Sequence, residues 1–233
     1  RVPRHLPGRR EIRRTGSLKR YNLPMKKYIL FDNDGVLVET EKWYFRANVE
    51  ILKTLGITLD EARYREIMVN GQSAFLLAEE AGYDSAGIEA ARDRRNALYQ
   101  HYLQNEEITI EGVKEVLDAL KERYRMGIVT SARREDFELI HAKRGITKHM
   151  DFVLCSGEYG RSKPHPDPYL KGLALFGGKK DEAVVVEDSQ RGLRSAVSAG
   201  IDCVVVHNAF TLLHDFSGAT HRIKTLQELE KLL

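Results

Sequence analysis

Acidic side chains come directly after two apolar stretches of the sequence. Asp32 and Asp34 follow the run 28–31, and Glu187 and Asp188 follow three consecutive valines. Short apolar runs of this kind predict buried strands. Because ligands of open α/β sheets bind outside the carboxyl ends of the strands, these carboxylates stand where chemistry is expected.

Each acidic pair also has a purely structural interpretation. Asp, Asn and Gly are ordinary turn formers, so Asp32, Asp34 and Gly35 could form a turn after a strand. Asp188 could cap the helix that follows it, with Glu187 in solvent. The catalytic interpretation therefore depends on other residues at the same edge of the sheet.

Convergence of the four carboxylates would require a cation. Each like-charged pair costs about 4 kcal/mol at a separation of ~4 Å and an effective dielectric constant of ~20. Hard oxygen ligands without His or Cys indicate Mg²⁺, which retains water molecules that a phosphate can replace. The acidic residues thus predict a magnesium site.

Two further segments offer groups that bind anions. The run 126–130 predicts a strand that ends in Thr130, followed by Ser131 and Ala132. A hydroxyl and backbone N–H groups at the start of a helix form an anion site, although alone they are only an N-cap. Lys163 precedes three of the six prolines of the chain. An isolated loop lysine is usually solvated, but one on a stiff segment near two acidic strand ends is better explained as a counter-ion.

The pattern of apolar residues predicts how these groups are positioned. Continuous Val/Ile runs predict a parallel α/β sheet with helices on both faces. The expected strands span 28–31, 126–130, 151–155, 183–187 and 202–206; the expected helices of this part span 112–122, 134–143, 167–176, 190–199 and 225–232. Helices expected at 40–55, 60–69, 73–81 and 86–103 form an insertion after the first strand, which predicts a small helical domain over its end.

Composition favours a globular protein. Apolar residues make up 42% and charged residues 30% of the chain, and no apolar run reaches the ~20 residues of a membrane span. No secretory signal is recognised, and Cys155 and Cys203 fit reduced core thiols, so we expect a cytoplasmic protein. The sequence leaves open whether it is a monomer or a dimer.

The positive charge is concentrated in residues 1–24, which hold eight basic residues and one acidic residue, whereas the rest holds 29 and 33. These residues predict an unfolded basic arm. Nucleic-acid binding by this arm would leave the acidic pairs and Lys163 unexplained, so we favour an extension without a catalytic role.

Four segments together resemble the motifs of the haloacid dehalogenase (HAD) superfamily, over about residues 25–233. They are Asp32-Asn33-Asp34-Gly35-Val36-Leu37, Thr130, Lys163-Pro164-His165-Pro166-Asp167-Pro168 and Glu187-Asp188-Ser189. The resemblance implies a Rossmann-like core, 25–41 and 107–233, with the first strand central. Residues 42–106 resemble the helical cap of the subfamily that includes phosphoglycolate phosphatase and β-phosphoglucomutase.

The resemblance also implies a role for each residue. Asp32 would be the nucleophile that forms an aspartyl-phosphate, and Asp34 would be the general acid and base. Thr130 and Lys163, with the turn at Ser131 and Ala132, would hold the phosphoryl oxygens. The implied ligands of Mg²⁺ are Asp32, the backbone carbonyl of Asp34, Asp188, and Glu187 either directly or through water. The expected function is hydrolysis of a small phosphorylated metabolite.

The same comparison separates the subfamilies. Haloacid dehalogenases and phosphonatases lack an acid at the position of Asp34. β-Phosphoglucomutases, the alternative, carry a His where Tyr44 stands and a cap-loop Arg that is missing near Asn70 and Gln72. We therefore favour hydrolysis. Tyr44, Asn70 and Gln72 are candidates to contact the leaving group, with ordinary surface positions equally open, and we expect Arg133 to be solvated.

Overall fold

The computed structural model describes residues 25–233, so the predicted basic arm lies outside the described residues. Within them, six parallel strands form one sheet in the order β3-β2-β1-β4-β5-β6. The strands are β1 (Tyr28–Phe31), β2 (Arg125–Val129), β3 (Phe152–Leu154), β4 (Ala183–Glu187), β5 (Asp202–Val206) and β6 (His221–Ile223). Phe31 pairs with Ile128 and Val186, so the end of β1 lies between the ends of β2 and β4. This confirms the predicted α/β fold with a central first strand.

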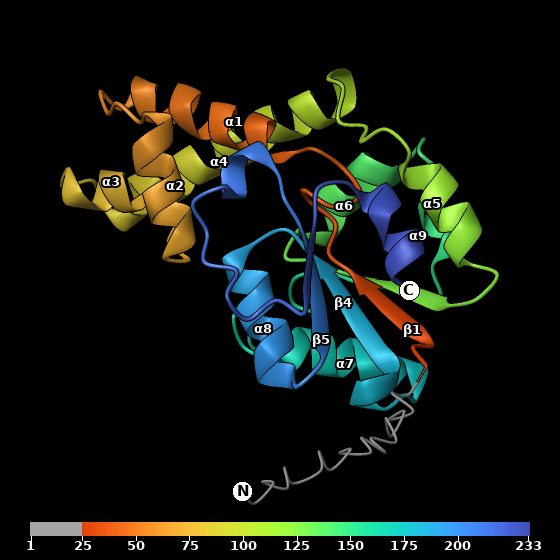
Figure 1. Cartoon of the computed structure of the whole chain (residues 1–233). Helices are drawn as coiled ribbons and strands as arrows, with labels where there is room; N and C mark the ends of the chain where they lie inside the picture. Colours follow the sequence, from red (N-terminus) through yellow and green to blue (C-terminus); the bar gives the residue numbers. More distant parts are fainter. Residues whose placement is uncertain (1–24) are drawn as a thin grey trace, which may run out of the picture.

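Alternation along β1 explains the helices on both faces of the sheet. Ile29 and Phe31 belong to one core cluster and Leu30 to a second. The first face is covered by α5 (Val113–Leu120), α6 (Arg134–His141) and α9 (Leu229–Leu232), and the second by α7 (Asp167–Phe176) and α8 (Gln190–Ala199). A Cβ on Gly172 would lie 2.9 Å from Leu30 Cδ2, so α7 packs closely on β1. Figure 1 shows α7 and α8 below the sheet and α5, α6 and α9 on its other side.

The inserted helices form a separate layer over the carboxyl ends of the strands (Figure 1). They are α1 (Glu41–Thr54), α2 (Glu61–Val69), α3 (Leu76–Glu80) and α4 (Ser85–Asn105). Asp60 and Asp84 cap α2 and α4 by accepting backbone N–H bonds. The helices share their own apolar cluster, which includes Tyr64 and Phe75. The chain enters and leaves this layer through two segments that pair at Val38 and Thr109.

Some predicted elements differ from the observed ones at the C-terminal end. β6 was not predicted, because in His221–Ile223 only Ile223 is buried and the strand depends on pairing with β5. The helix predicted over 225–232 is divided into a 3₁₀ turn, Leu226–Glu228, and α9. Further 3₁₀ turns span Thr147–His149, Lys180–Glu182 and Ala209–Thr211.

Two further features concern the cysteines and the length of the apolar helices. Cys155 and Cys203 are buried free thiols, as the sequence indicated. Among residues 25–233, no helix combines the length and the apolar character needed to cross a bilayer.

Candidate active site

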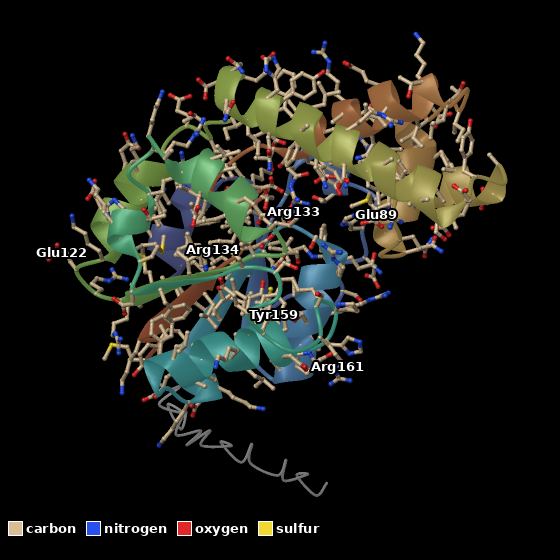
Figure 2. The ribbon with its side chains drawn as sticks, turned by 180° about the vertical axis from the view of Figure 1, so that it is seen from behind. Glu89, Glu122, Arg133, Arg134, Tyr159 and Arg161 are labelled. Atoms are coloured by element: carbon tan, nitrogen blue, oxygen red, sulfur yellow. The ribbon has the colours of Figure 1, made fainter. Side chains whose placement is uncertain are left out.

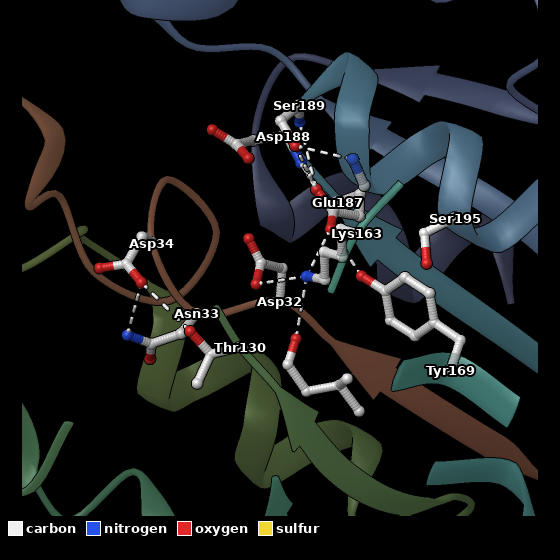
Figure 3. Close-up of polar contacts among 12 residues, drawn as sticks. Asp32, Asn33, Asp34, Thr130, Lys163, Tyr169, Glu187, Asp188, Ser189 and Ser195 are labelled. Atoms are coloured by element: carbon white, nitrogen blue, oxygen red, sulfur yellow. Dashed lines mark hydrogen bonds and ion pairs between the residues drawn. The ribbon is translucent and has the colours of Figure 1, made fainter. Parts of the chain in front are cut away.

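Lys163 lies at the centre of the site, beside the end of β1 (Figure 3). Its ammonium group donates to Asp32 Oδ1 at 2.8 Å, to Glu187 Oε1 at 2.7 Å and to the carbonyl of Val129 at 3.0 Å. The lysine side chain is 2% exposed, and all three of its donors are used. Lys163 therefore lies between the two acidic strand ends, of β1 and β4, as a counter-ion, and it also binds the end of β2.

Glu187 is held by a complete set of donors. Its Oε1 also accepts the hydroxyl of Tyr169 at 2.6 Å. Its Oε2 accepts the backbone N–H groups of Asp188 and Ser189 and the Ser189 hydroxyl, at 3.0 to 3.2 Å. Gly192 makes room for this carboxylate, because a Cβ there would lie 1.7 Å from Oε1. The fully buried Glu187 thus fixes Lys163, and its oxygens are already occupied by hydrogen bonds.

Three carboxylates form a compact cluster at the same edge. Oxygens of Asp32, Glu187 and Asp188 lie within 4.8 Å of one another. Asn208 Nδ2 donates to Asp188 Oδ2 at 2.6 Å, and a Cβ on Gly35 would lie 2.1 Å from that oxygen. Glycine at position 35, with φ of +77°, therefore lets the turn approach the Asp188 carboxylate.

The charges of this cluster are not balanced by Lys163 alone. Burial and the neighbouring Glu187 raise the pKa of Asp32 to about 7, although Lys163 opposes them. Burial, Glu187 and Asp32 raise the pKa of Asp188 well above its usual range. Burial acts to raise the pKa of Glu187 too, but Lys163 keeps it lowered. The clustered ligand atoms are all carboxylate oxygens, and Asp188 Oδ1 accepts no hydrogen bond from residues 25–233, so the site fits a divalent cation such as Mg²⁺.

Asp34 occupies a different position from the three clustered carboxylates. Its carboxylate accepts the Thr40 hydroxyl, the Thr130 hydroxyl at 3.3 Å and Asn33 Nδ2 at 3.4 Å. Thr40, Thr130 and Asn33 therefore hold Asp34, which is not one of the three clustered carboxylates. Burial raises the pKa of Asp34. A raised pKa suits a carboxyl group that must both give and take a proton.

The turn after β2 lies beside Asp34. Thr130 Oγ1 donates to Asp34 and accepts the N–H of Ala132 at 3.0 Å. The hydroxyl of Ser131 is buried and has no hydrogen-bond partner in the described part of the chain. Arg133 donates to Asp136 at 2.8 to 2.9 Å instead of being fully solvated, and Figure 2 shows it beneath the inserted helices. Ser131 thus offers an unpaired hydroxyl directly after Thr130.

The candidates from the inserted helices have different surroundings. Tyr44 packs edge-on against Tyr99, with ring centroids 5.1 Å apart, and the Arg95 guanidinium lies 4.3 Å from the Tyr44 centroid. Asn70 is exposed and donates to the Glu66 carbonyl at the end of α2. Gln72 is exposed, in the same loop.

Sequence reasoning missed several supporting residues. Thr40, Tyr169 and Asn208 each bond one of the site carboxylates. Asn208 follows β5, so the rule that placed Asp32 at a strand end would also have placed it here. Thr40 and Tyr169 lie in predicted helical regions whose sequence carries no comparable signal.

The comparison with protein families agrees with this geometry. Residues 29–206 match the family model of the haloacid dehalogenase-like hydrolases. The chain belongs to this family. The match covers all four motif segments, so the resemblance and the prediction of a hydrolase are confirmed.

Relatives extend over most of the chain. It is 32% identical over 187 residues to a putative pyrophosphatase, PpaX, of Caldanaerobacter subterraneus, covering 76% of this chain and 80% of the relative. It is 29% identical to a phosphorylated carbohydrates phosphatase of Thermotoga maritima, covering 77% and 85%. A crystal structure of a CbbY variant from Rhodobacter sphaeroides in complex with xylulose-1,5-bisphosphate superposes with a TM-score of 0.76 at 25% identity, covering 88% and 96%.

Proposed function

We propose that this protein is a Mg²⁺-dependent phosphatase that hydrolyses a small phosphorylated metabolite through an aspartyl-phosphate on Asp32. The observation that carries the proposal is the state of the Asp32 carboxylate. Lys163 holds one of its oxygens at 2.8 Å, and the other accepts no hydrogen bond from the described residues. A buried carboxylate with one oriented and one free oxygen is suited to attack phosphorus. The phosphatases among the relatives support the same reaction class.

The reaction proceeds in two displacements. Asp32 Oδ2 attacks phosphorus, the bond to the leaving oxygen breaks, and Asp34 gives its proton to that oxygen. Asp34 then takes a proton from water, which attacks phosphorus and breaks the bond to Asp32, releasing inorganic phosphate. The free hydroxyl of Ser131 donates to a phosphoryl oxygen, and the ammonium of Lys163, whose three donors are used, stabilises the phosphoryl group through its positive charge.

Asp32 and Asp188 would hold the metal ion, with the backbone carbonyl of Asp34. Bound Mg²⁺ would neutralise charge on the phosphoryl group and the carboxylates. Glu187 would act from outside this ligand set, because its oxygens accept five hydrogen bonds, from Lys163, Tyr169, Asp188 and Ser189.

Residues 42–106 would serve as a cap that closes the site from water. Two contacts across the boundary support this role. Gln100 Nε2 of α4 donates to Asp136 of α6 at 2.9 Å, and the rings of Phe45 and Phe210 lie 6.3 Å apart.

Buried free thiols fit a reducing compartment, and we propose that the protein is cytoplasmic.

The decisive variant is Asp32→Asn, which keeps the shape of the side chain and removes its nucleophile. Release of phosphate from p-nitrophenyl phosphate should fall by at least about 1,000-fold, with an unchanged circular dichroism spectrum. Asp93→Asn, an exposed α4 position without an ion pair among the described residues, is the matched control. EDTA should abolish wild-type activity and added Mg²⁺ should restore it. Substantial turnover by Asp32→Asn would refute the mechanism.

A mutase remains the natural alternative to test. Its expected cap histidine is replaced by Tyr44, which packs against Tyr99 and Arg95 instead of offering an imidazole. Incubation with a hexose 1-phosphate distinguishes the two activities. We expect free phosphate, whereas accumulation of a 6-phosphate isomer would identify a mutase.

A further inference from the structure

Arg191 is a charged side chain at the border of the site that the proposed mechanism does not use. It is the second residue of α8, three positions after Asp188. Its guanidinium makes no ion pair and no hydrogen bond with residues 25–233. Its stem reaches the inserted helices, because a Cβ built on Gly71 would lie 4.0 Å from Arg191 Cδ. Arg191 therefore spans the boundary between core and cap with its donors unused.

Arg65 approaches the same boundary from the cap. It lies on α2, where it pairs with Glu61, and its guanidinium carbon lies 5.5 Å from the ring centroid of Phe210, in the loop after β5. Its Nε is buried and has no hydrogen-bond partner within the described residues. A buried N–H without a partner costs free energy, so Arg65 also has an unused donor.

His214 contacts the start of α8, where Arg191 lies. Its Nδ1 accepts the backbone N–H of Gln190 at 3.1 Å, so in the neutral ring the proton is on Nε2. Burial lowers the pKa of His214; Glu187 opposes this effect, and the charges of Arg65 and Arg191 add to it. Both arginines therefore act on one imidazole beside the start of α8, and His214 is a neutral donor.

The charge of Arg191 also acts on two other titratable groups. Burial raises the pKa of Glu41, and Arg191 opposes this effect. Burial likewise raises the pKa of Tyr159, and Lys163 and Arg191 oppose it. Glu41 already accepts the hydroxyl of Tyr64, and the Tyr159 hydroxyl donates to the carbonyl of Thr130. The positive charge of Arg191 thus acts on a residue of α1 and on a residue near Lys163, and Arg191 forms an ion pair with neither.

We infer that Arg191 and Arg65 bind a second anionic group of the substrate, a phosphate or a carboxylate, while the first phosphate is held at Asp32. The inference rests on the proposed function and specifies its substrate class. Guanidinium groups bind both anions through paired, charge-assisted hydrogen bonds. Because one arginine belongs to the core and the other to the cap, a doubly anionic substrate would also hold the two together during reaction.

Competition experiments test the inference separately from the proposed function. Hydrolysis of p-nitrophenyl phosphate is the reporter, and the competitors are propylphosphonate, 3-phosphonopropionate and propane-1,3-bisphosphonate. These differ only in the group at the far end, so their inhibition constants isolate its contribution. We expect the wild type to prefer a doubly anionic competitor by about 10- to 100-fold, the range for a hydrogen bond to a charged group. The doubly anionic competitor with the lower inhibition constant indicates whether the second group of the substrate is a carboxylate or a phosphate.

Arg191→Gln should reduce this preference to less than about 3-fold, whereas Arg191→Lys should retain part of it. Arg194→Gln, at an exposed arginine three positions further along the same helix, should leave the preference intact. Should Arg191→Gln fail to fold, Arg65→Gln tests the same site. Equal inhibition by all three competitors, or equal weakening of all three in Arg191→Gln, would overturn the inference. Absence of any hydrolysis of the reporter would instead refute the proposed function.

Discussion

Replacing Lys163 with methionine removes the ammonium group that lies between Asp32 and Glu187 and keeps most of the side-chain volume. Both carboxylates are buried, at 12% and 0% side-chain exposure. Removing one partner of a buried ion pair costs about 3–5 kcal/mol, because it leaves charge without compensation. For a chain of this size each 1 kcal/mol lowers the melting temperature by about 2–4 °C. We therefore expect Lys163→Met to melt roughly 6–20 °C below the wild type.

The loss of stability should depend on pH in a defined direction. In the wild type, Lys163 lowers the pKa of both Asp32 and Glu187. Without the ammonium, both pKa values rise in the folded state and stay near ~4 when the chain unfolds. The folded variant then binds more protons than the unfolded chain, so its stability falls as pH rises. The difference from the wild type should be smaller at about pH 5 than at about pH 8.

Urea unfolding followed by circular dichroism at both pH values measures these free energies. Lys171→Met is the matched control, because Lys171 is exposed on α7 and makes no ion pair within residues 25–233. The double variant Lys163→Met/Glu187→Gln should recover part of the loss, since the amide leaves no unpaired charge. An unchanged unfolding midpoint, or a larger loss at pH 5 than at pH 8, would refute the reasoning.

Two further predictions concern groups that support the site. Burial lowers the pKa of His141, which bonds Asn33 Oδ1 at 2.7 Å, to about 4, whereas the unfolded value is ~6.5. Between pH ~6.5 and ~4 the imidazole is protonated in the unfolded chain but neutral in the folded one. The neutral His141 therefore contributes fully to the stability above pH ~6.5, and about 3 kcal/mol of that stability is lost as the pH falls toward ~4. The stability difference between wild type and His141→Gln should shrink over that range, and parallel profiles would contradict the assignment. Gly192→Ala should lower the free energy of unfolding by about 2 kcal/mol or more, despite the helix propensity of Ala, because the new Cβ would collide with Glu187. Gly218→Ala is the control, since its Cβ would make only an ordinary contact at 3.4 Å. A Gly192→Ala variant that is more stable than the wild type would show that Glu187 has room to move.

Local sequence signals predicted the elements that need little tertiary information. The bounds of α7 and α8 agree with the predicted 167–176 and 190–199, because each ends at a glycine in the left-handed region, Gly177 and Gly200. β1, and β4 as far as Val186, are apolar because helices cover both faces of the sheet. β6, by contrast, has one buried residue, so its pattern does not distinguish it from a loop.

The sequence by itself determined the parallel sheet, the inserted helices and the identity of the acidic strand ends, since short-range periodicity and strand-end position record these features. Only the tertiary structure decided which of these groups contact one another. Lys163 and Asp32 are 131 residues apart, and their 2.8 Å contact depends on packing that no local pattern encodes. The same holds for Asp34, which binds Thr40 and Thr130, and for Arg191, whose position between the inserted helices and the sheet depends on tertiary packing.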